Sequence, residues 1–430
     1  MPILRTLNVV TGEETVHRRP VQGLWPERET TLRPGDRIVS LLPLPAEGFL
    51  SKAGTYELWA IYEYDGGRSQ GASPPIRIRI RPATPCRPTF DTLQGVVTYA
   101  TWVNLGADPP DIVRTRFDVR AGGGVGETLA VAGATARSRP VLSLPPNRRD
   151  RSGHWIAWSD ESALRFIYLS RESGPAAAGR FDLGSGDARI VAPLVADPRE
   201  DRRVTPAAAA LVLLGAHRRL VSVRLTPEGP RPGPAADLPG PLPAWMMNHV
   251  RSDGGRLATL VQCRAGVVSL AAIRWTDRDI GVPAELGKWE GEFVAAGATL
   301  DLRDAIRGAT LLRVGPSLRK YVLARWSVDA GGGFRIEESR EPTLDERKSI
   351  SDVAIRVSSQ GIAAMLCRSA EGEWFVGGVQ GFRALPPSVT NSRRPLDLLF
   401  LNGVEPVVVC SQEGSGFRLL RADGSPLPAE

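Results

Sequence analysis

Long apolar runs, paired cysteines and lysine are all scarce in this chain of 430 residues. No run approaches the roughly 18 apolar residues that a membrane-spanning helix needs, so we expect no membrane segment. The chain has four cysteines and no Cys-x-x-Cys pair, which disfavours a zinc site. Three of them, Cys263, Cys367 and Cys410, end equivalent apolar runs, where we expect buried free thiols. Free thiols favour a cytoplasmic location, and an exported form whose leader has been removed stays open.

Motifs that bind cofactors or carry catalysis are also missing. The glycine-rich segment 122–126 lies between two runs of strand type, with no helix after it to form a phosphate loop. The segment 317–320 spells S-x-x-K, but it falls in a predicted hairpin turn, whereas that type of serine nucleophile needs a helix. The four histidines are scattered, without an acidic or cysteine partner at a telling offset. We therefore expect no cofactor, no metal site and no catalytic residue set.

Arginine supplies nearly all of the positive charge. The chain has 54 lysines and arginines against 47 acidic residues, and lysine occurs only at positions 52, 288, 320 and 348. Together with 45 glycines and 36 prolines, this composition is typical of a GC-rich bacterial genome, which explains the charge without invoking a ligand. Because a basic chain also attracts polyanions, direct nucleic-acid binding stays an alternative.

What the chain does contain is a recurring pair of apolar runs. The clearest pair is RLATLVQCRAGVVSLAAIRW, in which two β-rich runs flank a tight turn at Arg264-Ala265-Gly266. After Phe90 the pair returns about every 45–60 residues, and a shorter strand often follows it. The seven pairs span residues 95–103 and 112–119, 154–158 and 164–170, 209–214 and 219–225, 256–263 and 267–275, 309–314 and 320–328, 361–367 and 373–379, and 406–410 and 417–422.

This repeat resembles the blades of β-propellers as a class, of which the WD40 proteins are one example. The Gly-His and Trp-Asp marks of WD40 repeats are missing, so no specific family is assigned. The resemblance implies a seven-bladed β-propeller over residues 90–430, with the paired runs as inner strands. Six or eight blades stay open. We expect a strand from residues 88–94 to complete the last copy.

Residues 1–84 form a separate unit of short alternating runs. The segment 53–58, Ala-Gly-Thr-Tyr-Glu-Leu, resembles the tyrosine corner of immunoglobulin-like domains, with Leu58 where antibody domains have cysteine. The resemblance implies an immunoglobulin-like β-sandwich over residues 1–84, and residues 85–89 are expected to form a proline-containing linker. The predicted fold class is therefore all-β: an N-terminal sandwich followed by a seven-bladed β-propeller.

Arginines gather at one type of turn in this scheme. In a propeller, the turns between the paired strands and the links to the next blade emerge on the same face. The opposite turns, such as 252–255 and 358–361, are glycine-rich and mostly neutral or acidic. The arginines predicted to bind a partner are Arg148, Arg149, Arg151, Arg218, Arg219, Arg264, Arg319, Arg368, Arg393 and Arg394.

The leading hypothesis is a non-catalytic scaffold or adaptor that binds an acidic protein surface through this face. The rigid guanidinium fork suits carboxylates and phosphates, so a polyanion stays an alternative ligand. The opposing interpretation, a solvated arginine rim balanced by acids such as Asp150, Glu200 and Asp201, also stays open.

One cluster keeps an enzymatic alternative open. The segment 154–161 brings His154, Trp158, Asp160 and Glu161 together, and aromatic and carboxylate side chains suit a carbohydrate-acting or lyase-type enzyme. The competing interpretation is that its tryptophans wedge between blades and its acids belong to a hairpin turn.

Overall fold

The computed structural model describes most strands of the chain and many of the turns between them. The described part comprises residues 2–8, 14–17, 54–64, 69–80, 85–93, 97–105, 110–118, 123–124, 129–132, 140–142, 153–160, 163–170, 174–184, 188–196, 207–251, 253–301, 303–315, 320–340, 350–378, 381–390, 395–401, 404–412, 416–425 and 427.

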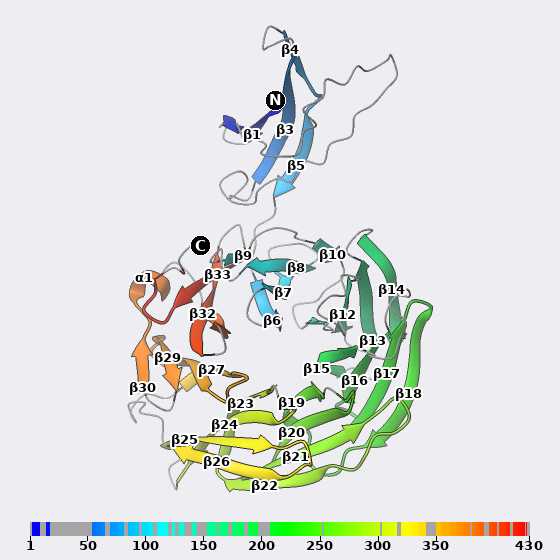
Figure 1. The fold of residues 1–430 in the computed structure, drawn as a ribbon, viewed down its shortest axis with the longest axis vertical. Helices are drawn as coiled ribbons and strands as arrows, with labels where there is room; N and C mark the ends of the chain where they lie inside the picture. The colour runs from blue at the N-terminus through cyan, green and yellow to red at the C-terminus, as the bar shows by residue number, and fades with distance from the viewer. Residues whose placement is uncertain are drawn as a thin grey trace. The chain divides into compact units, whose positions relative to one another are not determined.

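The described residues are almost entirely strand, which confirms the all-β class (Figure 1). The one helix among them, α1, spans four residues, Pro387–Thr390. No described helix has the length and apolar character needed to cross a membrane. Contacts divide the chain into two compact units: Met1–Thr84 with Gln412–Gly416, and Pro85–Ser411 with Phe417–Glu430.

The smaller unit is organised around one long strand, β3. Along one edge β3 pairs with β1, which in turn pairs with β2. Along its other edge it pairs with both β4 and β5. Tyr56 and Ile61 of β3 are its buried apolar side chains among the described residues. These strands form one sheet, so the immunoglobulin-like sandwich stays a prediction. The strands are β1 (Pro2–Asn8), β2 (Glu14–His17), β3 (Gly54–Tyr64), β4 (Ser69–Ala72) and β5 (Ile76–Ile80).

The larger unit contains five four-stranded sheets, each with its strands in chain order and antiparallel to their neighbours. In Figure 1, strands such as β18, β22 and β26 lie on the outside of this unit, and β15, β19 and β23 lie inside. The strands are β11 (Val141–Leu142), β12 (Gly153–Asp160), β13 (Ala163–Ser170), β14 (Gly174–Asp182), β15 (Ala188–Ala196), β16 (Ala208–Leu214), β17 (Arg219–Thr226), β18 (Gly229–Asp237), β19 (Pro243–Val250), β20 (Arg256–Arg264), β21 (Val267–Trp275), β22 (Ala284–Glu290), β23 (Glu292–Leu300), β24 (Ile306–Val314), β25 (Lys320–Val328), β26 (Phe334–Arg340), β27 (Ile350–Val357), β28 (Ala363–Ser369), β29 (Trp374–Gly378) and β30 (Gly381–Ala384).

A further sheet joins the two ends of this unit. Strands β6, β7 and β8 run in chain order, and β33 pairs with β9 through Arg418 and Gly123. Residues 85–89, predicted as a linker, instead lie in β6, and β6 pairs with β7 rather than completing the last copy. The strands are β6 (Pro85–Leu93), β7 (Val97–Asn104), β8 (Asp111–Asp118), β9 (Gly123–Gly124), β10 (Leu129–Ala132), β31 (Pro395–Leu401), β32 (Glu405–Gln412) and β33 (Gly416–Arg421).

All seven predicted pairs of strands are confirmed, but they are not the first strands of their sheets. Each pair is preceded by another strand, and for six of the seven pairs the sequence analysis missed it, as with β19 before β20–β21. The exception is β6, which covers most of the strand expected at residues 88–94. The physical reason lies in the register. The missed strands β15, β19, β23, β27 and β31 each shift register against their neighbour, as between Pro243 and Trp245. Such a bulge interrupts the two-residue alternation by which strands are recognised.

Successive sheets pack face to face, and each interface has its own apolar cluster. Trp155 lies between the β11–β14 and β15–β18 sheets. Trp275 lies between the β15–β18 and β19–β22 sheets, and Trp326 lies between the β19–β22 and β23–β26 sheets. Each of these side chains is at most 1% exposed. Gly308 leaves room for Trp326, because a Cβ added to Gly308 would lie 2.1 Å from the Trp326 ring.

The first strands of successive sheets also contact one another. Contacts link β11 to β15, β15 to β19, β19 to β23, β23 to β27 and β27 to β31, and β6 contacts both β31 and β11. Polar side chains reinforce two of these steps. Asn248 of β19 donates through Nδ2 to the carbonyls of Val191 (2.9 Å) and Pro193 (3.1 Å) at β15. Arg356 of β27 forms a two-pronged ion pair with Asp397 of β31.

Six turns share one five-residue geometry. In each, the first residue's N–H donates to the fifth residue's carbonyl, and the fourth residue's N–H donates to the first residue's carbonyl. The fourth residue has a positive φ, which favours glycine, and only Asp304 (φ 60°) replaces glycine there. The six turns begin at Arg251, Asp301, Asp329, Ser358, Ser369 and Arg421.

The cysteines only partly match the expectation of buried thiols. Cys367 and Cys410 are buried, and burial raises the pKa of the Cys367 thiol to about 12. Cys263 is exposed at the end of β20, so the prediction is wrong for this residue. It lies one residue before the β20–β21 turn, where the strand has left the core. The side chain of Cys86 lies outside the described residues.

Candidate functional site

Four of the ten predicted arginines fall within the described structure. Arg218 and Arg219 lie at the β16–β17 turn, Arg264 at the β20–β21 turn, and Arg368 next to the β28–β29 turn. Each turn joins the second strand of a sheet to the third. The others, Arg148, Arg149, Arg151, Arg319, Arg393 and Arg394, lie outside the described residues.

Sheet topology decides which turns share an end. With four antiparallel strands in chain order, the turn between strands two and three lies at the same end as the link to the next sheet. Hydrogen bonds tie these links to the turns: Leu238 N–H donates to Arg218 O (2.6 Å), and Gly291 N–H donates to Gly266 O (2.8 Å). The five-residue turns at 251–255, 301–305, 329–333 and 358–362 lie at the other end of their sheets.

The link between β18 and β19, residues 238–242, is held from two sheets at once. On one side, Arg218 Nη1 donates to Gly240 O at 3.5 Å. On the other, Gln262 of β20 donates through Nε2 to Pro239 O (2.9 Å) and Pro241 O (2.6 Å). Because Gln262 precedes Arg264 by two residues, the arginine-bearing ends of two neighbouring sheets flank one loop. We call Arg218, Arg219, Arg264 and the loop 238–242 the arginine surface.

The charge of the arginine surface is only partly compensated. Arg219 Nε lies 3.7 Å from Asp237 Oδ1, and the Asp237 side chain is 90% exposed, so this pair is weak. Neither Arg218 nor Arg264 has an ion pair within the described structure. The surface also has an apolar component, since Leu242 of the loop is exposed.

In the sheets beyond these two, two of the described arginines at the same end have partners. In the next sheet, Arg313 forms an ion pair of 3.1 Å with Glu292. Arg368 lies over the Trp374 ring, 5.9 Å from its centroid, and its turn carries Glu371 and Glu373. Of the four predicted arginines that the structure describes, Arg218 and Arg264 are therefore the two without an ion pair or an aromatic contact.

The proposed carbohydrate cluster is not assembled as a surface by the residues that are described. Trp158 is 4% exposed, and Trp155 stacks at a tilt on Phe166 (5.9 Å) and Tyr168 (5.1 Å) within the core. A buried tryptophan cannot stack on a sugar in solution, which agrees with the wedge interpretation. The side chains of His154 and Asp160, and all of Glu161, lie outside the described residues.

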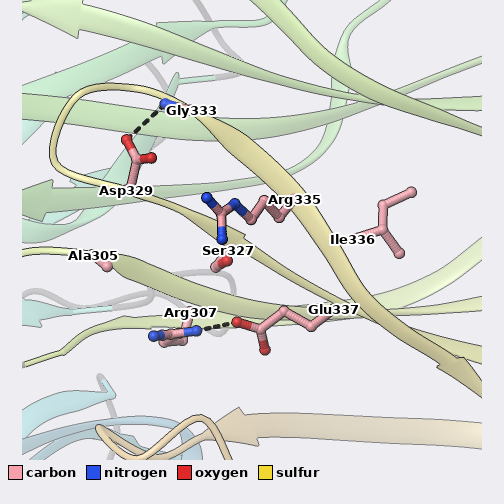
Figure 2. Close-up of a pocket in the computed structure, with 8 residues that line it drawn as sticks. All are labelled: Ala305, Arg307, Ser327, Asp329, Gly333, Arg335, Ile336 and Glu337. Atoms are coloured by element: carbon pink, nitrogen blue, oxygen red, sulfur yellow. Dashed lines mark hydrogen bonds and ion pairs between the residues drawn. The ribbon is translucent and has the colours of Figure 1, made fainter.

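The structure also contains a groove that the sequence analysis missed (Figure 2). It lies on the β23–β26 sheet, at the end away from the arginine surface, and has a volume of about 330 Å³. Strand alternation gives only the face of each residue, whereas the row formed by Arg307, Ser327 and Arg335 depends on the register between β24, β25 and β26. The lining residues are Ala305, Arg307, Ser327, Asp329, Gly333, Arg335, Ile336 and Glu337.

Ion pairs fix one wall of this groove. Arg307 Nε donates to Asp301 Oδ2 at 3.1 Å, and its Nη1 pairs with Glu337, as the dashed line in Figure 2 marks. The hydrogen bond to Asp301 raises the pKa of Arg307. Burial raises the pKa of Asp301, but the N–H groups of Ala305 and Arg303, with Arg307, lower it by more. In the described part of the chain, no three His, Cys, Asp or Glu side chains lie together as metal ligands.

Comparisons with known proteins give a likeness of fold only. No protein-family model and no curated protein matches the chain. An ulvan lyase from a new polysaccharide lyase family aligns at 10% identity over 81% of this chain and 96% of its own, with a TM-score of 0.47. A candidate 6-phosphogluconolactonase from Bacteroides fragilis aligns at 12% identity over 90% and 98%, with a TM-score of 0.40. Both TM-scores are below 0.5, so neither likeness bears on the activity of this chain.

Proposed function

We propose that this protein is a non-catalytic interaction module that binds an acidic protein through the arginine surface. The observation that carries the proposal is the placement of Arg218 and Arg264 on equivalent turns of neighbouring sheets, on either side of one loop. The guanidinium groups of Arg218 and Arg264 have no ion pair within the described structure. They would repel each other less when a carboxylate of a bound protein lies between them.

The architecture we infer beneath this surface is a seven-bladed β-propeller. Support comes from the seven repeated groups of strands and from the contacts between first strands, which return from β31 to β6. In such a ring the turns of all seven sheets would surround one opening, so that arginines far apart in sequence become neighbours.

The partner suited to this surface is acidic and carries at least one exposed apolar side chain. Arginine forms bidentate hydrogen bonds with carboxylates, and Leu242 between the arginines offers an apolar contact. A protein surface supplies both, whereas a nucleic acid supplies phosphates without aliphatic side chains. The net charge of +7 is the observation that favours nucleic acid as a second candidate.

Charge reversal on the full-length protein tests the proposal. Arg218→Glu with Arg264→Glu should abolish recovery of the partners that the wild-type protein captures from its host extract. The matched control is Arg278→Glu with Arg303→Glu, two exposed arginines on turns at the other end of their sheets. Unchanged melting temperatures would establish that both variants are folded.

Two outcomes would refute the proposal. Equal capture by wild type and by the Arg218→Glu/Arg264→Glu variant would remove the arginine surface as the binding site. Binding of a random-sequence duplex with a steep inverse dependence on salt, lost in the same variant, would replace the protein partner by nucleic acid.

A further inference from the structure

The groove on the β23–β26 sheet begins where an apolar interface ends. One face of this sheet presents Ile306, Trp326 and Val328 to the β19–β22 sheet, and all three are buried. The opposite face packs Ala309 and Leu311 against the β27–β30 sheet. Towards the end of the strands this second face becomes polar.

A cross-strand row makes the floor of the groove. Arg307 of β24 is opposite Ser327 of β25, which is opposite Arg335 of β26. The Arg307 side chain also reaches the next sheet. A Cβ added to Gly361, in the turn between β27 and β28, would lie 3.9 Å from Cδ of Arg307. Figure 2 shows the Arg335 and Ser327 side chains close together, with Ile336 pointing away from them.

The two arginines of the row differ in their partners. Arg307 is held by Asp301 and Glu337, so its charge is compensated. Arg335 has no hydrogen bond or ion pair within the described structure, and it lies beside the hydroxyl of Ser327, a residue that is 8% exposed. A guanidinium next to a hydroxyl is a donor pair of the kind that binds a carboxylate.

An acceptor, Asp329, lines the same groove at its turn end. Asp329 accepts the Gly333 N–H through Oδ1 at 2.7 Å, which leaves Oδ2 available to a ligand. The turn that carries Asp329 is fixed from the neighbouring sheet, because Arg251 donates to Ala330 O (2.6 Å) and Asp329 O (3.2 Å). The carboxylate is therefore positioned before any ligand binds.

From this arrangement we propose that the groove binds a small zwitterion, and that α-amino acids are the ligand class. The ligand carboxylate binds Arg335 and the Ser327 hydroxyl, and its ammonium group binds Asp329. The groove volume of about 330 Å³ lies at the lower limit for ligand sites, which suits a molecule of amino-acid size. Because so few atoms make contact and the groove is open to solvent, the dissociation constant should be on the order of millimolar.

Three probes on the full-length protein separate the contributions. L-alanine carries both charges, acetate carries only the carboxylate, and methylammonium carries only the positive charge. Ligand-observed NMR titration should give saturable binding of L-alanine about tenfold tighter than binding of either fragment. Absence of saturable L-alanine binding, or equal affinities for L-alanine and acetate, would overturn the proposal.

Substitutions then assign the contacts. Arg335→Gln should remove L-alanine binding, whereas Arg231→Gln, an exposed arginine on the outer strand β18, should leave it unchanged. Asp329→Asn keeps an acceptor for the Gly333 N–H but removes the charge, so the affinity for L-alanine should fall to that for acetate. Retained L-alanine affinity in either groove variant, with an unchanged melting temperature, would contradict the assignment. The arginine surface is distant from this groove along the strands, so failure here leaves the interaction proposal untouched.

Discussion

At the scale of single residues, His249 shows how burial lowers the pKa of a side chain. It lies on β19, 3% exposed, with Nε2 2.9 Å from Thr259 Oγ1. Burial, together with the nearby positive charge of Arg251, lowers its pKa from 6.5 to about 3. A neutral imidazole held by one hydroxyl makes this histidine a structural group rather than a catalytic base.

The depressed pKa of His249 gives the free energy of unfolding a defined pH dependence. Below about pH 6.5 the unfolded chain binds a proton that the native protein does not bind until about pH 3, so stability falls as pH falls. Between pH 6 and 5 this loss should be about 1 kcal/mol, most of which His249→Gln should remove. Urea unfolding at several pH values measures the difference, and His217→Gln in an exposed turn is the control. An identical pH slope in wild type and His249→Gln would contradict the pKa shift.

The sequence predicts residue environments well where a strand alternates regularly and poorly where it ends. The two tryptophans of β12 are buried, and Trp155 lies between two sheets, because an apolar run of that length is typical of a buried strand. Cys263 was expected to be buried like Cys367, yet its exposure depends on how far β20 extends beyond the core. The partners of Arg335 could not be derived either, because ion pairs depend on side chains brought together from separate strands.

At the scale of elements, the sequence analysis missed the first strand of most sheets of the larger unit. These strands approach one another closely, and Gly297 of β23 shows how closely. A Cβ at this position would lie 2.4 Å from Ile355 O of β27. The contact is with backbone, which cannot move aside as a flexible side chain can. Small residues and register shifts in these strands are thus consequences of their packing, and both weaken the pattern that reveals a strand.

Gly297→Ala should destabilise the protein by about 1–3 kcal/mol, because either β23 or β27 must shift to accept the methyl group. Gly331→Ala is the control, since its Cβ would meet only the Asp329 side chain in an exposed turn. Chemical unfolding of both variants measures the effect. Equal stabilities for the two variants would mean that β23 and β27 lie farther apart than described.

At the scale of the whole larger unit, the decisive question is whether the seven groups of strands unfold together. An open array of repeats frays from its ends, whereas a closed ring has no end sheet. The contact of β31 with β6 and the pairing of β33 with β9 favour closure. The recurring pairs of strands were accessible from sequence, but closure would depend on contacts between residues about 300 positions apart.

If the larger unit is a closed ring, a substitution that destabilises the last sheet should also destabilise the sheets in the middle of the unit. Val408→Ala removes buried methyl groups from β32, and this residue is fully buried. Amide hydrogen exchange of β20 should accelerate by the same factor as that of β32, about fivefold to seventyfold for a loss of 1–2.5 kcal/mol. Val261→Ala in β20 is the matched core substitution. Faster exchange confined to β31–β33 would indicate an open array.

The six five-residue turns keep the same two backbone hydrogen bonds with very different sequences, from Ser-Ser-Gln-Gly-Ile to Asp-Leu-Arg-Asp-Ala. We expect these turns to be exchangeable, so that a turn grafted from one site to another would connect its two strands in the same directions. The exposed positions of each turn can therefore be substituted independently during evolution. The same property would let short peptides be displayed on a rigid support. Such freedom lets copies drift until little sequence likeness remains between them, although the hydrogen bonds at each turn persist.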